Sequence, residues 1–595
     1  MLNQELVKIF NQMALYFEMD DVPFKPQAYE KAAVNLDVLP NDVGDIYEKE
    51  GIEGLRKIPG VGQHIADKIV EYIKTGKIKA YSDLKKKIPV DIDELTAVEG
   101  VGPKKIKELY GLLKIKNLKD LERAAKGGKI RSLPRFGLKT EQNILESIGF
   151  LKRSHGRFLL GEILPTVRKI IGDLKKLKPA RTTGIVPRQN DFVGLESGGE
   201  VKQISEAGSV RRRKETIGDV DILITGSDPK KVINYFVSLP GVVKIWGKGP
   251  TKASIRLKDG LDIDLRVLPE NQFGSALQYF TGSKEHNIIL RKIAIDKKYK
   301  LSEYGLFRGA KIIAGKTEED IYKKLGMDYI EPELRENTGE IEAALAGKLP
   351  KLISYNDILG DLHIQTNWNG GENSIEEMAD TAIKMGYQYI GISDHTKFLR
   401  IENGLDEKQL MLQRKEIDKL NSRFILYASR FRILHGCEAN IMADGSIDIK
   451  DEALAKLDYV IAGVHSQLKM PKEKMTKRII KAMKNLHVDI ISHPTGRILK
   501  KRDEYEVDFD KILSAAKETG TVLEINSMPK RLDLKDVDIR KAKNAGVKMV
   551  INTDAHHKDH MSLIKYGISQ ARRGWAEKKD IVNAWSVDKM LKMLK

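Results

Sequence analysis

The chain is 595 residues long, which is too long for a single hydrophobic core, so we expect several domains. Its 103 Lys and Arg residues against 84 Asp and Glu residues give a net charge of +19, which favours a polyanionic partner such as nucleic acid. A single cysteine, Cys437, excludes an intrachain disulfide framework. No signal-peptide pattern opens the sequence and no apolar run approaches the ~20 residues that span a bilayer, so we expect a soluble, cytoplasmic protein with no membrane partner.

Three segments in the first third look like copies of one hairpin followed by an amphipathic helix. They are Ile58–Gly62, Val98–Gly102 and Leu133–Gly137. The paired glycines are Gly60 and Gly62 in the first copy and Gly100 and Gly102 in the second. Such glycines let the backbone turn so that amides at the next helix face a DNA phosphate, and the turn carbonyls can hold Na⁺ or K⁺. This is the helix-hairpin-helix pattern, which reads no base. The third copy lacks its first glycine, so its identity stays open.

The most informative motif combines a phosphate-holding turn with paired carboxylates. The turn is Gly208–Arg212, and Asp219 and Asp221 follow it in an expected strand. Side chains alternate along a strand, so both carboxylates point to one face and can share a divalent ion. Two Mg²⁺ ions about 3.5–4 Å apart are what phosphoryl transfer to a 3′-oxygen uses. A third carboxylate must therefore come from a neighbouring strand.

Two expected strands, 254–257 and 261–267, supply that third carboxylate. Asp262, Asp264 and Arg266 share one face of the second strand. Spacing alone does not choose between Asp262 and Asp264.

From Asp361 onward short apolar strands alternate with amphipathic helices, which predicts a parallel sheet or barrel. The expected strands are 389–392, 459–462, 489–491, 521–525 and 548–551. Residues of metal-binding type lie just past the strand ends, where barrel active sites sit. They are His363, Asp394, His395, Glu438, His465, His493, Asp554 and His556. Five of the 12 histidines in these places indicate a metal centre rather than packing.

The residues from Gly208 to Arg291 resemble the family X DNA polymerases, of which polymerase β is the familiar member. The resemblance selects Asp264, in Ile263–Arg266, as the third carboxylate beside Asp219 and Asp221. It implies that Tyr279–Ser283 is the turn beside the sugar of the incoming nucleotide, where two aromatic rings exclude a ribose 2′-hydroxyl. The implied nucleotide-binding residues are Gly208, Ser209, Arg212, Gly218, Tyr279, Phe280, Gly282 and Asn287, and Arg291 would touch the template.

The first 80 residues are similar to the small 5′-phosphate-binding domain of the polymerase-β type, through Pro26–Ala33 and Ile58–Lys68. In that family a lysine after the hairpin forms a Schiff base that removes deoxyribose phosphate, and Lys68 stands at that place. A nucleophilic lysine needs a lowered pKa, which nearby cations such as Lys25, His64 and Lys31 could supply. His64 replaces a usual lysine, and the alternative that Lys68 only binds phosphate stays open.

The C-terminal part resembles the PHP (polymerase and histidinol phosphatase) domain, which holds three metals, usually zinc or manganese. Its motifs match at His363, His395, Glu438, His465, His493, Asp554 and His556. Gln365 stands where the family has a second histidine, and Gly370 or Gly371 stands where Asp or His is usual. An amide is a poor ligand and glycine offers none, so occupancy by Mn²⁺ or Zn²⁺ should be weakened. An inactive, structural PHP domain is the alternative.

We therefore expect a multidomain α+β and α/β protein that acts as a monomer on gapped or nicked DNA and dNTPs, near the nucleoid. The expected parts are a helical lyase-like domain (1–80), a helix-hairpin-helix subdomain (81–150), a nucleotidyltransferase palm (151–270), a thumb or fingers subdomain (271–330), a linker (331–356) and a distorted β/α barrel of the PHP type (357–595). The expected function is gap filling in base excision repair, with 3′-5′ exonuclease or abasic-site cleavage at the PHP centre and lyase activity at Lys68. The alternatives are a template-independent nucleotidyltransferase and a DNA-end-binding scaffold.

Overall fold

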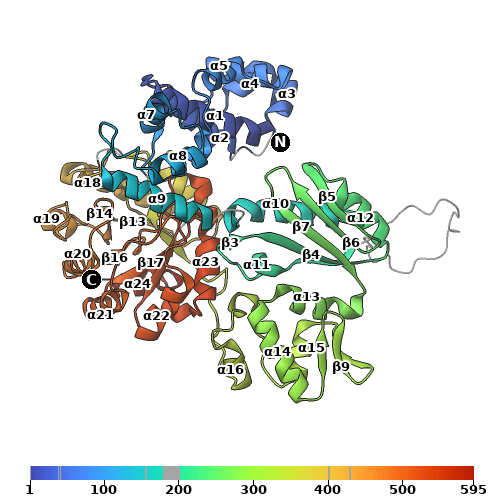
Figure 1. The fold of residues 1–595 in the computed structure, drawn as a ribbon. Coiled ribbons are helices and arrows are strands. Elements are labelled where there is room, and N and C mark those ends of the chain that lie inside the picture. Colours follow the sequence, from blue (N-terminus) through green and yellow to red (C-terminus); the bar gives the residue numbers. More distant parts are fainter. Residues whose placement is uncertain are drawn as a thin grey trace. The chain divides into compact units, whose positions relative to one another are not determined.

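The architecture comes from a computed structural model of the chain (Figure 1). It describes residues 2–37, 39, 42–98, 100–153, 157–177, 201–399, 403–427 and 431–594. Glu99 of the second predicted hairpin and residues 178–200 of the predicted palm segment lie outside these ranges. The chain divides into two compact units, Met1–His155 with Lys500–Arg502, and Gly156–Leu499 with Asp503–Lys595. Across the described ranges no helix is both long and apolar enough to cross a bilayer.

The first unit is helical. Its helices are α1 (Leu2–Met19), α2 (Lys25–Asp37), α3 (Val43–Arg56), α4 (Gln63–Thr75), α5 (Lys79–Lys87), α6 (Ile92–Thr96), α7 (Pro103–Leu113), α8 (Leu118–Lys126) and α9 (Leu138–Arg153). Helix α1 contributes to two hydrophobic cores, because Phe10 packs with the first four helices and Tyr16 packs with the later ones. The predicted helical N-terminal region is confirmed.

The three predicted hairpins share one backbone conformation. Gly60 and Gly100 have φ of 76° and 79°, and Arg135 takes φ of 65° at the equivalent place. In each copy the next residue donates its amide to the carbonyl three residues before it, at 3.0–3.1 Å. The third copy therefore forms the same turn although a non-glycine residue must adopt the left-handed conformation.

The palm is a mixed sheet covered by helices on both faces. Its elements are β1 (Phe158–Leu159), α10 (Leu160–Lys175), β2 (Val201–Glu206), α11 (Gly208–Arg211), β3 (Thr216–Ile217), β4 (Asp219–Gly226), α12 (Pro229–Val237), β5 (Val242–Lys248), β6 (Lys252–Leu257) and β7 (Asp262–Leu268). The strand order is β2-β4-β7-β6-β5, and β4 and β7 are parallel. Ile222 and Ile224 of β4 pack beneath α10 and α12, while Leu223 between them packs on the opposite face with α13 (Phe273–Thr281).

The thumb follows directly. Besides α13 it contains η1 (Glu270–Gln272), α14 (Lys284–Asp296), β8 (Lys300–Ser302), β9 (Gly305–Arg308), β10 (Lys311–Ala314), α15 (Glu318–Leu325), η2 (Pro332–Leu334) and α16 (Glu340–Leu345). Leu334 and Ile341 join the thumb core, so the segment expected to be a linker contains helices that pack against the thumb.

The C-terminal part is a ring of parallel strands surrounded by helices. Its elements are β11 (Gly360–Ile364), α17 (Ile375–Lys384), β12 (Tyr389–Ile392), α18 (Glu407–Tyr427), β13 (Arg432–His435), β14 (Glu438–Asn440), α19 (Asp451–Leu454), β15 (Ile461–Gly463), α20 (Lys472–Met483), β16 (Ile490–Ile491), α21 (Phe509–Thr519), β17 (Val522–Asn526), α22 (Asp536–Ala545), β18 (Met549–Asn552), η4 (Lys558–Leu563), α23 (Ile564–Arg573), η5 (Lys578–Asp580), η6 (Val582–Ala584) and α24 (Val587–Leu591). Parallel bridges join Ile364 to Ala555 and His395 to Glu438, which close the two sheets on each other. The predicted multidomain α+β fold with a C-terminal barrel of parallel strands is confirmed.

Candidate active sites

Four aspartates lie on one face of the palm sheet. Asp219 is opposite Asp262 and Asp221 is opposite Asp264 in the parallel pairing of β4 with β7. Burial, together with the nearby carboxylates of Asp219 and Asp264, raises the pKa of Asp221 to about 6. A divalent cation relieves such repulsion, so this set of oxygen donors fits Mg²⁺.

Asp262 differs from its neighbours because its carboxylate is already paired. Arg256 donates from Nε to Oδ1 at 2.8 Å and from Nη2 to Oδ2 at 2.6 Å, and Trp246 donates its indole N–H to Oδ1 at 2.9 Å. The bond from Arg256 lowers the pKa of Asp262. This pairing supports Asp264, rather than Asp262, as the third member of the carboxylate set.

The phosphate turn lies directly beside these carboxylates. Gly208 opens α11 with φ of 61°, and a Cβ there would lie 3.1 Å from Asp221 Oδ2. Only glycine combines that conformation with so close an approach. Ser209 follows within α11, and Gly218 precedes β4 with only 3.3 Å between its virtual Cβ and a guanidinium nitrogen of Arg157.

Arg212, at the end of α11, is held by the thumb. Its Nε donates to Glu336 Oε1 at 3.1 Å, and Nη1 donates to the carbonyl of Thr281. Gly282 follows, where a Cβ would lie 3.2 Å from Arg212 Nη1. The predicted phosphate-binding arginine and the predicted sugar-side turn are thus in contact.

The aromatic pair, expected in a turn, lies in the last turn of α13 and contacts the carboxylate strand through Phe280. The rings of Tyr279 and Phe280 are 5.1 Å apart and edge to face, and the guanidinium of Arg266 lies 4.4 Å from the Phe280 ring. Asn287 donates from Nδ2 to the carbonyl of Tyr279 at 2.7 Å. Arg291 lies one turn further along α14 and is half-buried.

A buried ion-pair cluster behind the turn was not predicted. Glu318 accepts from Arg211 Nη1 at 2.9 Å and Nη2 at 2.5 Å, and from Arg335 Nη1 at 2.5 Å. Burial would raise the pKa of Glu318, but Arg335 and Arg211 lower it to about 2. Arg211 and Glu318 are 107 positions apart in the sequence, so no local spacing could have indicated the cluster.

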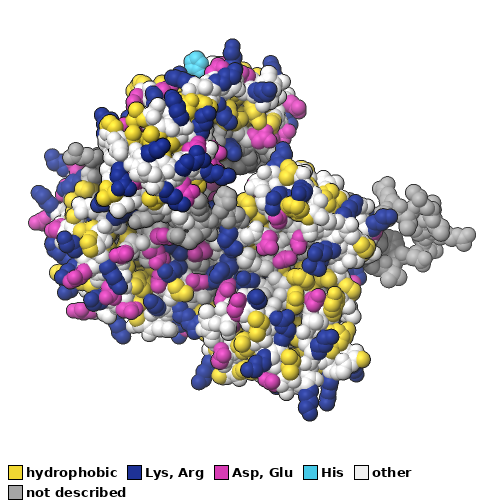
Figure 2. Space-filling model, viewed as in Figure 1, with side chains coloured by type: hydrophobic (Ala, Val, Ile, Leu, Met, Phe, Trp, Pro, Cys, Tyr) yellow, Lys and Arg dark blue, Asp and Glu magenta, His cyan; other side chains and the backbone are white. Residues whose placement is uncertain are grey.

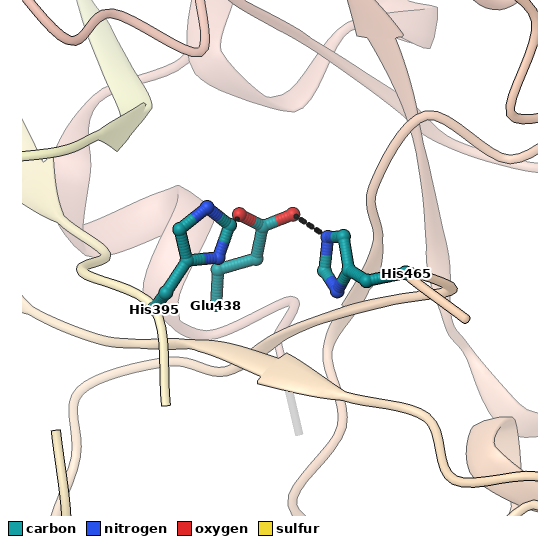
Figure 3. Close-up of side chains that lie close together, drawn as sticks. All are labelled: His395, Glu438 and His465. Atoms are coloured by element: carbon teal, nitrogen blue, oxygen red, sulfur yellow. Dashed lines mark hydrogen bonds and ion pairs between the residues drawn. The ribbon is translucent and has the colours of Figure 1, made fainter. Parts of the chain in front are cut away.

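The second candidate site is centred on the Glu438 carboxylate. Its Oε1 lies 3.1 Å from Nε2 of His465 and from Nε2 of His493. Its Oε2 lies 3.0 Å from His363 Nε2 and 2.9 Å from His395 Nδ1. Figure 3 shows the carboxylate between the imidazoles of His395 and His465. Burial would raise the pKa of Glu438, but the surrounding histidines hold it well below its usual value.

Two of these imidazoles present buried nitrogen atoms to the centre. His363 Nε2 and His395 Nδ1 lie close to Glu438 Oε2, but among the described residues neither nitrogen has a partner in hydrogen-bond geometry. Asp554 Oδ1 lies 3.5 Å from His363 Nε2, and His556 Nδ1 lies 3.8 Å from Asp554 Oδ1. Buried imidazole nitrogens gathered around carboxylate oxygens are a donor set that fits a transition metal or zinc.

At the two positions where the chain lacks the family's usual metal ligands, Gln365 is hydrogen-bonded and Gly371 has no room for a side chain. Gln365 donates from Nε2 to Glu438 Oε2 at 3.1 Å, and its Oε1 accepts from the backbone amide of His395 at 3.1 Å. A Cβ on Gly371 would lie 2.6 Å from the Gln365 carbonyl oxygen, so the local backbone has no room for a side chain there. Part of the expected ligand set is therefore replaced by a hydrogen-bonded amide.

The third candidate site is a cavity of about 770 Å³ in the first unit. Lys25, His64, Lys68 and Lys87 line it, together with Gly60, Gly62 and several aromatic residues. Lys31, expected to add positive charge, is not among the lining residues. Space is open around the virtual Cβ atoms of Gly62, Gly100 and Gly102, so another backbone can approach there. Lys and Arg side chains are spread over the visible face of the molecule, interspersed with Asp and Glu (Figure 2).

Family models match most of the chain. A helix-hairpin-helix domain matches residues 1–78, a SAM-like helix-hairpin-helix tandem matches 92–149, the DNA polymerase beta thumb matches 276–336 and the PHP domain matches 361–528. The tandem includes the third hairpin, which the sequence pattern left open.

Known relatives cover the whole chain or a third of it. DNA polymerase/3′-5′ exonuclease PolX of Bacillus subtilis (strain 168) is 36% identical over 600 aligned residues that span 100% of both chains. Probable phosphatases of Thermoanaerobacter sp. (strain X514) and Acetivibrio thermocellus are 35% and 30% identical, and each alignment covers 33% of this chain and 78% of the relative. One alignment thus spans the palm, thumb, hairpins and histidine-lined barrel of this chain, and the chain belongs to the family X DNA polymerases that carry a C-terminal PHP domain.

Proposed function

We propose that the palm fills gaps in DNA by templated nucleotide addition, as in base excision repair. The register that places Asp221 opposite Asp264, with Asp219 on the same face, carries the proposal. Two divalent cations, bound by these carboxylates, would lower the charge on the triphosphate and on the attacking 3′-oxygen. Ser209 and Arg212 would bind the triphosphate. Gly208 and Gly218 have no side chain, so the triphosphate could approach the backbone there.

The neighbouring residues would select the substrate. Tyr279 and Phe280 stand beside the expected sugar position and would exclude a ribose 2′-hydroxyl. Asn287, held against the Tyr279 carbonyl, would contact the nascent base pair, and Arg291 the template. The hairpins at Gly60, Gly62, Gly100 and Gly102 would hold DNA by its phosphates, with a monovalent cation at the turn carbonyls.

Primer extension on DNA with a one-nucleotide gap tests this proposal. Asp264→Ala is expected to abolish nucleotide addition while gapped-DNA binding stays close to that of the unaltered enzyme. Asp262→Ala is the matched control, because Asp262 shares the strand and the face but pairs with Arg256. Synthesis that survives in Asp264→Ala, or incorporation that ignores the template base, would contradict the proposal.

We further propose 3′-5′ exonuclease activity at the PHP centre. The support is the set of imidazoles around Glu438 and the similarity to the Bacillus subtilis relative, which is a DNA polymerase/3′-5′ exonuclease by name. A Mn²⁺ or Zn²⁺ ion held there would activate a water molecule toward a phosphodiester. In one extension gel, a His465→Ala, His493→Ala double variant should lose shortening of the primer and keep its growth, whereas Asp264→Ala should do the reverse. Undiminished Mn²⁺-dependent shortening in the double variant would remove this site from the reaction.

A lyase reaction at Lys68 is the third proposal. Lys68 lines the 770 Å³ cavity beside Lys25, His64 and Lys87. Its amine would attack C1′ of an incised abasic sugar and form a Schiff base. Borohydride should trap a covalent adduct that Lys68→Ala loses and Lys87→Ala keeps. Equal trapping in both variants would exclude Lys68 as the nucleophile.

A further inference from the structure

A chain of ion pairs connects the PHP domain to the palm arginine Arg212. Arg573, the last residue of α23, donates from Nη1 to Glu336 Oε1 at 3.1 Å and to the backbone carbonyl of Arg212 at 2.8 Å. The same Glu336 oxygen accepts from Arg212 Nε at 3.1 Å. One carboxylate oxygen of the thumb is therefore shared by an arginine of the palm and an arginine of the PHP domain.

The shared carboxylate is largely shielded from solvent and charged. The side chains of Arg573, Arg212 and Glu336 are 3%, 13% and 20% exposed. Lys214 Nζ lies 3.8 Å from the other Glu336 oxygen, and Arg573 also pairs with Asp536. Burial would raise the pKa of Glu336, but Arg573, Arg212 and Lys214 lower it.

The loop that follows Arg212 is held by the PHP domain at a second point. Glu215, in the segment between α11 and β3, accepts from Arg497 Nη2 at 2.8 Å and from Gln570 Nε2 at 3.1 Å. Gln570 lies on α23, one turn before Arg573. Helix α23 thus contacts both the backbone and the side-chain partner of the proposed triphosphate-binding residue.

We propose that Arg573 and Glu336 are positioning residues for nucleotide addition, through which α23 of the PHP domain sets the affinity of the palm for the triphosphate of the incoming nucleotide. The inference rests on the proposed role of Arg212. Glu336 orients the guanidinium by its Nε, and among the described residues Nη2 of Arg212 has no hydrogen-bond partner, which leaves that nitrogen to bind an anion.

The electrostatic reason is the sign of the Glu336 charge. A carboxylate next to Arg212 competes with the triphosphate for that arginine, and its negative charge also repels the triphosphate. Arg573 offsets this negative charge, so the carboxylate can orient Arg212 without opposing the nucleotide. Removing Arg573 should therefore weaken nucleotide binding, and removing the Glu336 charge as well should restore it.

Steady-state gap filling by the full-length enzyme tests this reasoning, with KM for dNTP, kcat and gapped-DNA affinity measured separately. Arg573→Gln should raise the KM about tenfold with kcat and DNA affinity within about twofold, because a charge-assisted contact supports binding alone. Glu336→Gln should stay within about threefold of the unaltered enzyme. The double variant should return to the Glu336→Gln value, an interaction that loss of folding would not produce.

Two further variants separate positioning from stability. Arg572 is the residue before Arg573 on α23 and pairs with Glu333 instead of Glu336. Arg572→Gln breaks that pair without affecting the contacts of Arg212, so it should leave the KM unchanged. Arg573→Lys keeps the buried charge and should raise the KM only about threefold. An unchanged KM in Arg573→Gln, or a double variant worse than Arg573→Gln, would overturn the inference. If the unaltered enzyme adds no nucleotide, the proposed function itself fails, and the inference fails with it.

Discussion

The Glu318 cluster yields a sharp prediction about the stability of the thumb. Glu318→Gln removes a carboxylate that is only 4% exposed and that faces Arg211 and the fully buried Arg335. The fall of its pKa from an ordinary value of 4.5 to about 2 corresponds to about 3 kcal/mol of stabilisation. Leaving buried arginines without a counter-charge costs a similar ~3–5 kcal/mol.

Hydrogen exchange of peptides that cover α15 measures this effect in the full-length protein, where a single global unfolding transition is not expected. Protection in α15 should fall about a hundredfold in Glu318→Gln. Glu319→Gln is the matched control, because Glu319 is the next residue of the helix and is exposed, and its effect should stay below about 0.5 kcal/mol. Indistinguishable protection in the two variants would refute the argument from burial and pairing.

The same reasoning fixes a pH dependence. The folded-state pKa of Glu318 lies below its ordinary value, so its contribution is complete above pH 4.5 and is lost as the pH falls toward 2. Stability of α15 in the unaltered protein should decline across that window, and Glu318→Gln should flatten the decline. A decline of equal steepness in the variant would assign it to other carboxylates.

Three other predictions follow from the geometry of the sites. Lowering the pH from 7 to 5 should raise the Mg²⁺ concentration for half-maximal nucleotide addition about tenfold. Protons compete with Mg²⁺ for Asp221, because burial and the neighbouring carboxylates raise the pKa of Asp221 to about 6. An unchanged Mg²⁺ requirement would contradict this competition. Gln365→His should tighten Mn²⁺ binding about tenfold in calorimetry of an Asp219→Ala, Asp221→Ala background, because imidazole replaces an amide beside Glu438; equal affinity would show that the lost histidine is not what limits the site. Gly60→Ala should destabilise the first unit by about 1–3 kcal/mol in thermal unfolding, because φ is 76° and a Cβ would lie 2.9 Å from Lys31 Cγ. Gly62→Ala, which has open space around it, should cost less than about 1 kcal/mol. The opposite order of the two costs would contradict the assignment of the turn.

The sequence predicted the parts of the palm that depend on strand periodicity. Alternation placed Asp219 with Asp221 and Asp262 with Asp264 on common faces, and the pairing of β4 with β7 then brings the two sets together. It could not separate Asp262 from Asp264, because the difference lies in a cross-strand partner, Arg256. Five strands of the C-terminal barrel were likewise predicted to within about two residues from their apolar runs, namely β12, β15, β16, β17 and β18, whereas β11, β13 and β14 were not predicted.

Interactions between distant segments could not be predicted. Glu318 meets Arg211 across 107 positions, and Arg573 meets Glu336 across 237 positions, so no motif or period connects them. The third hairpin was left open because its first glycine is replaced by Arg135, although the backbone there adopts the same left-handed turn. Propensity disfavours that conformation for arginine, and the surrounding helices impose it.

The packing of the palm has a consequence for how the palm and the barrel are separated in experiments. Leu532 and Tyr566 come from the C-terminal barrel, yet they belong to the hydrophobic core beneath the palm sheet. A fragment that stops before the barrel would expose that core to water, and Glu215 would lose its partner Arg497. Truncation would therefore report on a damaged palm rather than on an intact palm without the barrel, so point substitutions in the barrel are the sounder way to separate the two parts.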